Sequence, residues 1–221
     1  MNTPGGNTNA TAEHSLSLVM SLYRNIPEAN FGTHKGLWEK KKFKGLELRG
    51  KKLGIIGFGN VGARFSELAI ALGMSVSVFS KSFFSRNIDY PKINFVSLDS
   101  VISESDIISF HCKPSSDGMP IITLKELKLM KKNCVILNTA RGGLIDENDL
   151  KVALDSNMIR GAALDVFNNE PAIESPLFGT ANLILTPHIA ASTDEAQLVV
   201  AEQIAIQISN YFNKGEIVNS V

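Results

Sequence analysis

Residues 53–62 read LGIIGFGNVG, an apolar run followed at once by three glycines in a GxGxxG pattern. The run predicts a buried strand, and the amphipathic stretch 63–72 after it predicts a helix. Between a strand and a helix, Gly57 permits the tight turn, Gly59 lets the backbone approach a pyrophosphate, and Gly62 lets the helix pack closely on the strand. The helix also presents free N–H groups and the positive end of its dipole to phosphates. The stretch therefore predicts a dinucleotide site rather than a purely structural turn.

Five more apolar runs of strand length follow, and helical patterns separate most of them: 76–79, 106–111, 134–138, 161–166 and 182–185. Strands that alternate with helices are typical of a parallel sheet covered on both faces. Capping patterns mark the helix starts, with capping-box spacing at Thr123 and Glu126 and at Ser192 and Glu195, and Asp146 opening a third helix. We therefore predict an α/β fold with a doubly wound parallel sheet of the Rossmann type.

An extra N-terminal helix is predicted at about residues 10–26, and its apolar stripe consists of Leu16, Val19, Met20 and Tyr23. The linker that follows, 27–44, holds the only tryptophan, Trp38, among basic residues. A basic linker is often simply solvated, but an aromatic side chain inside one often docks on a partner. Because the stripe and Trp38 lie outside the predicted sheet, we expect a homodimer through this region. The alternative is that the stripe folds back on its own domain.

The chain is accordingly divided into two parts. Residues 1–44 are expected to form a hinge, a dimerisation helix and a linker, and residues 45–221 a dinucleotide-binding domain that ends in a C-terminal helix.

Composition narrows the class of partner. Lysine plus arginine and aspartate plus glutamate both number 22, so no net charge attracts nucleic acid or an anionic membrane. Cys112 and Cys134 form no CxxC pair, and no apolar run approaches the ~18 residues needed to span a bilayer. The N-terminus has neither the basic nor the apolar region of a secretory leader. These features predict a cytoplasmic protein with small-molecule or protein partners, and no metal is expected.

The end of the second predicted strand bears on the choice of cofactor. An NAD-selective site usually has an acidic residue there, which binds the ribose hydroxyls. This chain instead has Ser80 and Lys81. Loss of the carboxylate removes repulsion of a 2′-phosphate, and Lys81 could attract one, which favours NADP or a relaxed preference. The alternative is that Ser80 binds the ribose weakly and Lys81 points to water, so the cofactor is left as NAD or NADP.

Polar residues follow several of the predicted strands. Ligands bind at the carboxyl ends of strands in a doubly wound sheet, and His111, Arg141, Asp165 and His188 all lie there. Each of these residues has an ordinary structural explanation by itself, but such explanations do not predict that all of them meet at one edge of the sheet. Glu170 follows the same strand as Asp165 and could reach the neighbouring His188, where a carboxylate would fix the tautomer of an acid–base imidazole. The planar guanidinium of Arg141 suits a substrate carboxylate or carbonyl oxygen.

Five longer motifs carry a family resemblance: NTPGGNT, GLWEKKKFKGLELRGKKLGIIGFGNVG, NTARGGLIDE, ALDVFNNEP and TPHIAASTDEAQ. They resemble the D-isomer-specific 2-hydroxyacid dehydrogenases, in particular the phosphoglycerate type. The resemblance implies that Arg141 binds the substrate, that His188 is the acid–base group and that Glu170 is its partner. It also implies that Asp165 and the backbone near Ala140 orient the nicotinamide, that Asn60 and Val61 hold the pyrophosphate, and that Cys112 belongs to the cofactor site.

The chain also departs from the family pattern. Lys113 and Pro114 replace the usual proline and apolar residue after the histidine, next to the cofactor site. The resemblance further implies a substrate domain that is largely absent from these 221 residues. We therefore predict the cofactor-binding and catalytic half of an oxidoreductase that acts on a D-2-hydroxy acid, with 3-phosphoglycerate as the expected substrate. The alternative is a non-catalytic nucleotide-sensing or scaffold module derived from this family.

Overall fold

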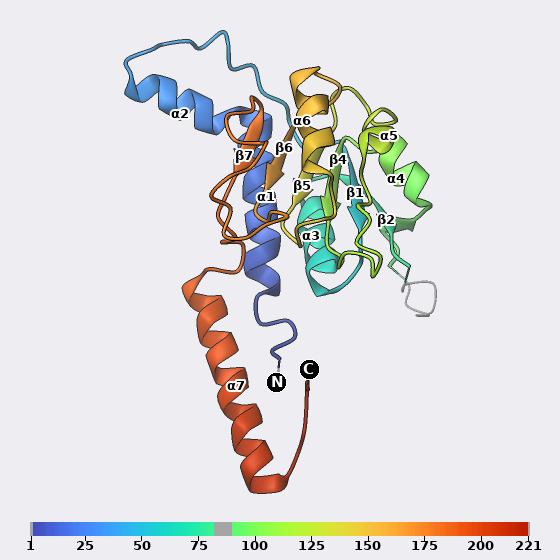
Figure 1. The fold of residues 1–221 in the computed structure, drawn as a ribbon, viewed down its shortest axis with the longest axis vertical. Helices are drawn as coiled ribbons and strands as arrows, with labels where there is room; N and C mark the ends of the chain where they lie inside the picture. Colours follow the sequence, from blue (N-terminus) through green and yellow to red (C-terminus); the bar gives the residue numbers. More distant parts are fainter. Residues whose placement is uncertain (1, 82–89, 221) are drawn as a thin grey trace.

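The computed structural model describes residues 2–81 and 90–220. Within these ranges the strands form one sheet of seven, all parallel, in the order β3-β2-β1-β4-β5-β6-β7 (Figure 1). Their bounds are β1 Lys52–Ile56, β2 Ser75–Phe79, β3 Ile93–Phe95, β4 Ile107–Phe110, β5 Val135–Asn138, β6 Gly161–Leu164 and β7 Leu183–Leu185. The strand order reverses at β1, which pairs with both β2 and β4. The predicted doubly wound fold is confirmed.

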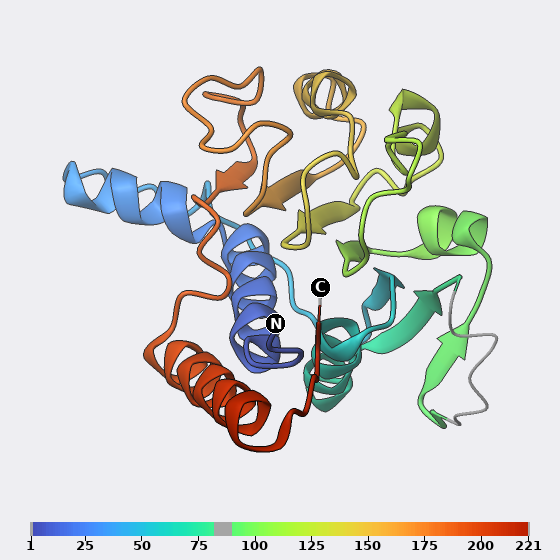
Figure 2. The ribbon, with the colours of Figure 1, turned by 60° about the horizontal axis from the view of Figure 1, so that its bottom comes forward.

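Helices cover both faces of the sheet, as Figure 2 shows. One face carries α1 and α3, and the other carries α4, α5 and α6. The bounds of these helices are α1 Thr8–Arg24, α3 Asn60–Ala71, α4 Leu98–Glu104, α5 Leu124–Leu127 and α6 Glu147–Asp155. Each face therefore has its own apolar core, with the sheet between them.

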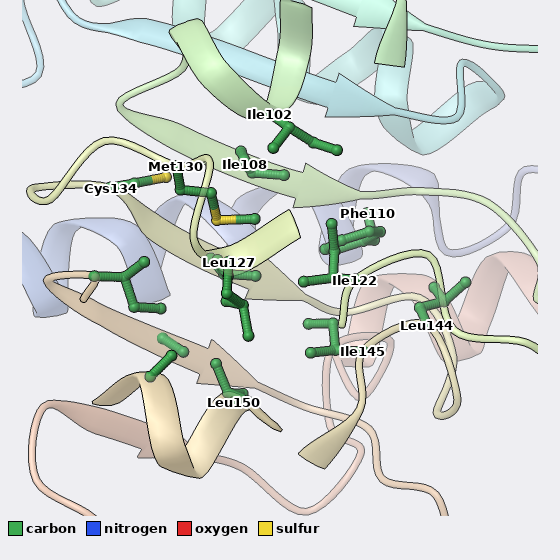
Figure 3. Packing of buried hydrophobic residues seen from close by; sticks show 14 of the residues in the cluster. Ile102, Ile108, Phe110, Ile122, Leu127, Met130, Cys134, Leu144, Ile145 and Leu150 are labelled. Carbon is green, nitrogen blue, oxygen red and sulfur yellow. The ribbon is translucent and has the colours of Figure 1, made fainter. Parts of the chain in front are cut away.

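The core under α4, α5 and α6 is built from large aliphatic side chains (Figure 3). Ile108 and Phe110 of β4, Leu127 of α5 and Leu150 of α6 are all almost completely inaccessible to solvent. Burial of one such side chain contributes about 1.5–3 kcal/mol. This packing holds the strands, and therefore their carboxyl ends, in fixed positions.

Most of the predicted elements are present, with shifts at their ends. All six predicted strands occur, but β3 was not predicted. The helix after the glycines begins at Asn60, three residues earlier than expected. Thr123 and Glu126 form the predicted capping box, and Asp146 accepts from the Asp149 N–H. The cap predicted at Ser192 is wrong, because Thr193 accepts from the Ala196 N–H instead.

The N-terminal region differs from its prediction in two ways. The linker expected at 27–44 begins with a second helix, α2, Ile26–His34. The stripe of α1 lies largely against the sheet: Val19 and Tyr23 are buried in the core it shares with α3, and Met20 remains exposed. The expectation that this stripe needs a partner for its burial is therefore wrong. Trp38, beyond α2, is 86% exposed.

The last helix, α7, Asp194–Lys214, projects away from the sheet, and the tail after it returns toward the N-terminus (Figure 1). The Asn2 N–H donates to the carbonyl of Asn219, and the Gln207 amide donates to the carbonyl of Asn2. In the described part of the chain, no helix combines the length and apolar character needed to cross a membrane.

Candidate active site

The turn after β1 is compact because two of its three glycines allow close approach. Gly57 has φ +96°, and a Cβ added there would lie 2.5 Å from the His111 carbonyl oxygen. A Cβ added at Gly62 would lie 2.6 Å from the Gly57 carbonyl oxygen. These two glycines thus bring the turn, the start of α3 and the end of β4 into contact.

Gly59 has the opposite surroundings. It is the N-cap of α3 and supplies no side-chain cap, so the N–H groups of the first turn of the helix have no capping side chain. A Cβ added there would meet nothing within 4 Å. The space next to Gly59 is therefore open to a ligand.

A cavity of about 280 Å³ lies at this helix N-terminus. Its walls come from residues 5–11, from the start of α3 and from the segments that follow β4 and β5. The lining residues are Gly5, Asn7, Thr8, Thr11, Gly59, Asn60, Val61, His111, Cys112, Lys113, Thr139, Ala140 and Arg141. Uncapped N–H groups and an open glycine fit the phosphates of a dinucleotide. Of the predicted cofactor residues, Gly59, Asn60, Val61, Cys112 and Ala140 line the cavity.

Two residues after β4 make a neutral wall. Burial lowers the pKa of His111 to about 3, and its Nε2 lies 2.9 Å from the Ser109 hydroxyl. Burial raises the pKa of the Cys112 thiol to about 11, although its backbone hydrogen bond and Lys81 oppose the rise. Neither side chain is therefore charged at neutral pH.

Ser80 and Lys81 follow β2, outside the lining of this cavity. Ser80 is buried and Lys81 is exposed. The charge of Lys81 partly opposes the rise in the pKa of Cys112, and it adds slightly to the lowering of the pKa of Asp117, which hydrogen bonds from Ser115 and Met119 mainly cause. The effect of this pair on cofactor preference stays a prediction.

Arg141 lies in a turn that follows β5 and is fixed by a buried asparagine. The Asn138 side chain donates to the Arg141 carbonyl at 2.8 Å and accepts from the Ala140 N–H at 3.1 Å. Gly142 packs directly on the Phe167 carbonyl, where any Cβ would clash. The guanidinium of Arg141 is exposed and donates to the Ala140 carbonyl at 2.6 Å. A guanidinium has five N–H donors, so Arg141 retains donors that can bind an anion.

Glu170 and His188 are in contact, as the sequence led us to expect. Glu170 Oε2 lies 2.6 Å from His188 Nδ1, and Glu170 Oε1 accepts from the Phe167 N–H at 2.9 Å. Burial raises the pKa of Glu170, but these hydrogen bonds outweigh it and the pKa lies below its usual value. With Nδ1 bonded to Glu170, Nε2 of His188 is left to face a ligand.

A second cavity, of about 530 Å³, brings the three predicted catalytic residues together. Arg141, Glu170 and His188 all line it, along with Lys113, Pro114, Gly142, Phe167 and Asn168. Arg141 and Lys113 also line the cavity next to α3. Arg141, the Glu170–His188 pair and the uncapped N-terminus of α3 are thus adjacent at one edge of the sheet.

The carboxylate of Asp165 has another environment. It is fully buried and does not line the cavity next to α3. It accepts from the Thr186 hydroxyl at 2.5 Å and from the N–H groups of Ile189 and Ala190 at 2.9 and 2.8 Å. The structure thus shows Asp165 holding the turn that carries His188, whereas its contact with a nicotinamide stays a prediction.

The family model described as "D-isomer specific 2-hydroxyacid dehydrogenase, NAD binding domain" matches residues 16–190. The chain belongs to this family. The match includes the glycine turn after β1 and the residues Arg141, Glu170 and His188.

Named relatives and a solved structure agree with this membership. The D-3-phosphoglycerate dehydrogenase of Synechocystis sp. is 41% identical over 208 residues, which are 94% of this chain and 38% of that protein. The glyoxylate reductase of Thermococcus litoralis is 38% identical over 223 residues, 98% of this chain and 67% of that protein. The structure of an acyclic imino acid reductase in complex with NADPH and D-Arg is 34% identical with a TM-score of 0.88, covering 98% of this chain and 69% of that one.

The curated D-3-phosphoglycerate dehydrogenase is thus matched over less than half of its own length. Within the family fold, sequence reasoning missed the N-terminal residues that line the cofactor cavity, Asn7, Thr8 and Thr11. It also missed His14 and Thr186, which contact Asp165. Asn7 and Thr8 lie in the motif NTPGGNT, and Thr186 lies in TPHIAASTDEAQ, but neither motif shows that α1 packs on the sheet and so brings the N-terminal residues to the site. In the described ranges, no group of three or more His, Cys, Asp or Glu side chains could hold a metal ion.

Proposed function

We propose that this chain is the cofactor-binding and catalytic half of a dehydrogenase that transfers hydride between NAD(P) and a D-2-hydroxy acid. The observation that carries the proposal is the Glu170–His188 contact of 2.6 Å, in the cavity that also contains Arg141. A histidine oriented by a carboxylate, next to a cation that binds carboxylates and next to a dinucleotide cradle, suits oxidation of a carbon that bears a hydroxyl group.

Each residue has a defined task in this reaction. The bound nicotinamide supplies or accepts the hydride. Arg141 binds the substrate carboxylate and polarises the oxygen on C2. In the oxidation direction, His188 Nε2 accepts the hydroxyl proton, and the Glu170 carboxylate stabilises the imidazolium that results. In reduction, the same imidazolium returns the proton to the carbonyl oxygen.

The substrate that we propose is 3-phosphoglycerate, with glyoxylate-type 2-oxo acids as the neighbouring class. The support is the identity to a D-3-phosphoglycerate dehydrogenase and to a glyoxylate reductase. Both NAD and NADP are proposed as cofactors, because Ser80 stands at the end of β2 and the similar imino acid reductase was solved with NADPH. Two free thiols, Cys112 and Cys134, favour a reducing compartment such as the cytoplasm.

We propose a homodimer that forms through α2 and the segment after it. We also propose that the chain divides into residues 1–44 and residues 45–221. Phe31, Leu37 and Trp38 are exposed apolar side chains on this arm, which extends away from the sheet in Figure 1. Burial against a second copy would remove them from water. Sedimentation at micromolar concentration is expected to give a dimer, and Trp38→Ala is expected to shift it toward the monomer. A wild-type monomer would contradict this interface.

The function is tested by following the absorbance of NADH with glyoxylate as the oxidant. We expect residues 1–221 to oxidise NADH slowly, well below the ordinary enzyme range of ~1 to 10³ per second, because solvent reaches the exposed Glu170–His188 pair and screens its charges. His188→Ala should abolish the slow reaction. Cofactor binding with no His188-dependent oxidation would instead favour a nucleotide-sensing or scaffold module. Turnover in the ordinary range would show that these residues form a complete catalyst.

A further inference from the structure

The backbone of His188 is held in an unusual conformation. Its φ is +54°, in the left-handed region that residues with a side chain rarely adopt. A residue stays in such a conformation only when the surrounding structure holds it there. The proposed acid–base residue therefore depends on neighbours that fix its turn.

Asp165 holds this turn on both sides of His188. Before His188, the Thr186 hydroxyl donates to Asp165 Oδ1. After it, the Ile189 N–H donates to Oδ1 and the Ala190 N–H donates to Oδ2. One buried carboxylate thus binds residues two positions before His188 and one and two positions after it.

A residue far away in the sequence completes this network. His14 of α1 places Nε2 3.2 Å from Thr186 Oγ1 and 3.5 Å from Asp165 Oδ1. The Thr186 hydroxyl has one proton, which it donates to Asp165, so it can only accept from His14. His14 must therefore carry a proton on Nε2, and the hydrogen bonds run from His14 through Thr186 to Asp165.

The helix that carries His14 is firmly seated. The neighbouring Ser15 is fully buried, and its hydroxyl lies 2.9 Å from the Thr139 hydroxyl at the end of β5. Leu18 and Val19 are buried in the core against the sheet. Burial raises the pKa of Asp165, but the polar groups around it, His14 foremost and then Thr186 and the Ile189 and Ala190 N–H groups, outweigh burial and lower it. His14 thus helps to keep a charged carboxylate inside the protein.

We propose that His14 is a positioning residue for His188: through Thr186 and Asp165 it fixes the turn that presents the imidazole to Glu170 and to the substrate. This inference rests on the proposed function, because it assigns His14 a task in the same reaction. It ties the N-terminal helix to the acid–base group at the far end of the chain.

Nuclear magnetic resonance of the 221-residue chain tests the proposal, because the chain has only four histidines. Three variants change His14: His14→Leu removes both ring nitrogens, His14→Gln retains an N–H donor with similar reach, and His14→Asn retains an amide that is too short. His34→Leu is the matched control, since His34 is exposed at the end of α2. The readouts are the ring-nitrogen shifts of His188 and the hydrogen exchange of the Ile189 and Ala190 amides, with the β5 amides reporting on the fold.

In His14→Leu and His14→Asn we expect the Ile189 and Ala190 amides to exchange about tenfold faster and the His188 ring to lose its single Nδ1–H tautomer. His14→Gln and His34→Leu should stay within about twofold of the wild type, and the β5 amides should stay unchanged throughout. Wild-type values in His14→Leu and His14→Asn would overturn the proposal. The proposal would also be overturned if His14→Gln lost as much protection of the Ile189 and Ala190 amides, or if the β5 amides lost protection equally. Either result would indicate that His14 has a general packing role. NADH titration of the wild type tests the proposed function separately, since the His188 turn is measured without cofactor.

Discussion

The turn after β1 and the turn after β7 lie at the same edge of the sheet, but they are built in opposite ways. At Gly57 and Gly62 the backbone packs too closely for a side chain, and at Gly59 it leaves open the helix N-terminus that we propose binds phosphates. At His188 a single side chain is the proposed acid–base group, and its turn is held by the buried carboxylate of Asp165, which follows β6. Binding phosphates needs exposed N–H groups, which a local sequence motif can supply. Orienting one imidazole needs partners from separate parts of the chain.

The largest effect is expected from removal of the Asp165 carboxylate, which holds the turn after β7. Asp165→Ala would leave the Thr186 hydroxyl and the Ile189 and Ala190 N–H groups without their acceptor in a buried site. We expect the free energy of unfolding to fall by about 3–5 kcal/mol. Urea denaturation measures it, with Asp155→Ala as the control. Asp155 is exposed and pairs with Lys151, so its loss should cost only about 0.3–0.5 kcal/mol. Equal effects of the two variants would show that Asp165 does not hold the turn.

Substitutions in the glycine turn should separate its contribution to stability from its contribution to binding. Gly62→Ala would place a Cβ 2.6 Å from the Gly57 carbonyl, and we expect a loss of about 1–3 kcal/mol in unfolding free energy. Gly59→Ala faces open space, and its φ of −93° suits any residue, so stability should change by less than about 1 kcal/mol. Urea denaturation of both variants is the measurement. A reversed order would contradict the different tasks assigned to the two glycines.

Sequence reasoning was most successful where the signal is local. The glycine turn and the polar strand ends were located because strand period and turn residues are read within a few positions. The segment that forms α2 was interpreted as linker, although it begins with a proline in the first turn, where proline is favoured in a helix. The short, partly exposed β3 offers no continuous apolar run. Ser192 and Thr193 are both capping residues, and only the backbone decides between them.

Long-range contacts were the part that the sequence could not give. His14 and Thr186 are 172 positions apart and meet only because α1 packs on the sheet beside β5 and β6. Likewise, the stripe of α1 has the same apolar pattern whether it packs on its own sheet or on a second copy. Packing geometry, which periodicity does not encode, decides both cases.

His111, which follows β4 next to β1, is expected to make the stability of the fold depend on pH. Its pKa is about 3 in the folded protein and about 6.5 when unfolded, so unfolding takes up a proton below pH 6.5. Its contribution is fully present above pH 6.5 and is lost as the pH falls toward 3. Since the ring is partly accessible, we expect a loss of about 1–2 kcal/mol between pH 6.5 and 4.5. Urea denaturation across this range should show a weaker dependence in His111→Gln, and equal slopes would contradict the account.

The smallest expected effect concerns cofactor choice at the end of β2. NADP should bind the wild type no more than about tenfold more weakly than NAD, because Ser80 brings no carboxylate to repel a 2′-phosphate. Ser80→Asp should widen the preference for NAD by about tenfold or more. Titration calorimetry with both cofactors measures it, and Ser75→Asp, at the opposite end of β2, is the control. A wild-type preference for NAD of about a hundredfold would refute the role of Ser80.

We propose that the backbone of the turn after β1 holds the dinucleotide while His188 serves proton transfer. A fluorescence titration of NADH against the wild type, Gly59→Ala and His188→Ala tests this division most directly. We predict that His188→Ala binds NADH within about threefold of the wild type and that Gly59→Ala binds at least about tenfold more weakly. An equal loss in both variants, or a wild type that does not bind NADH, would contradict it.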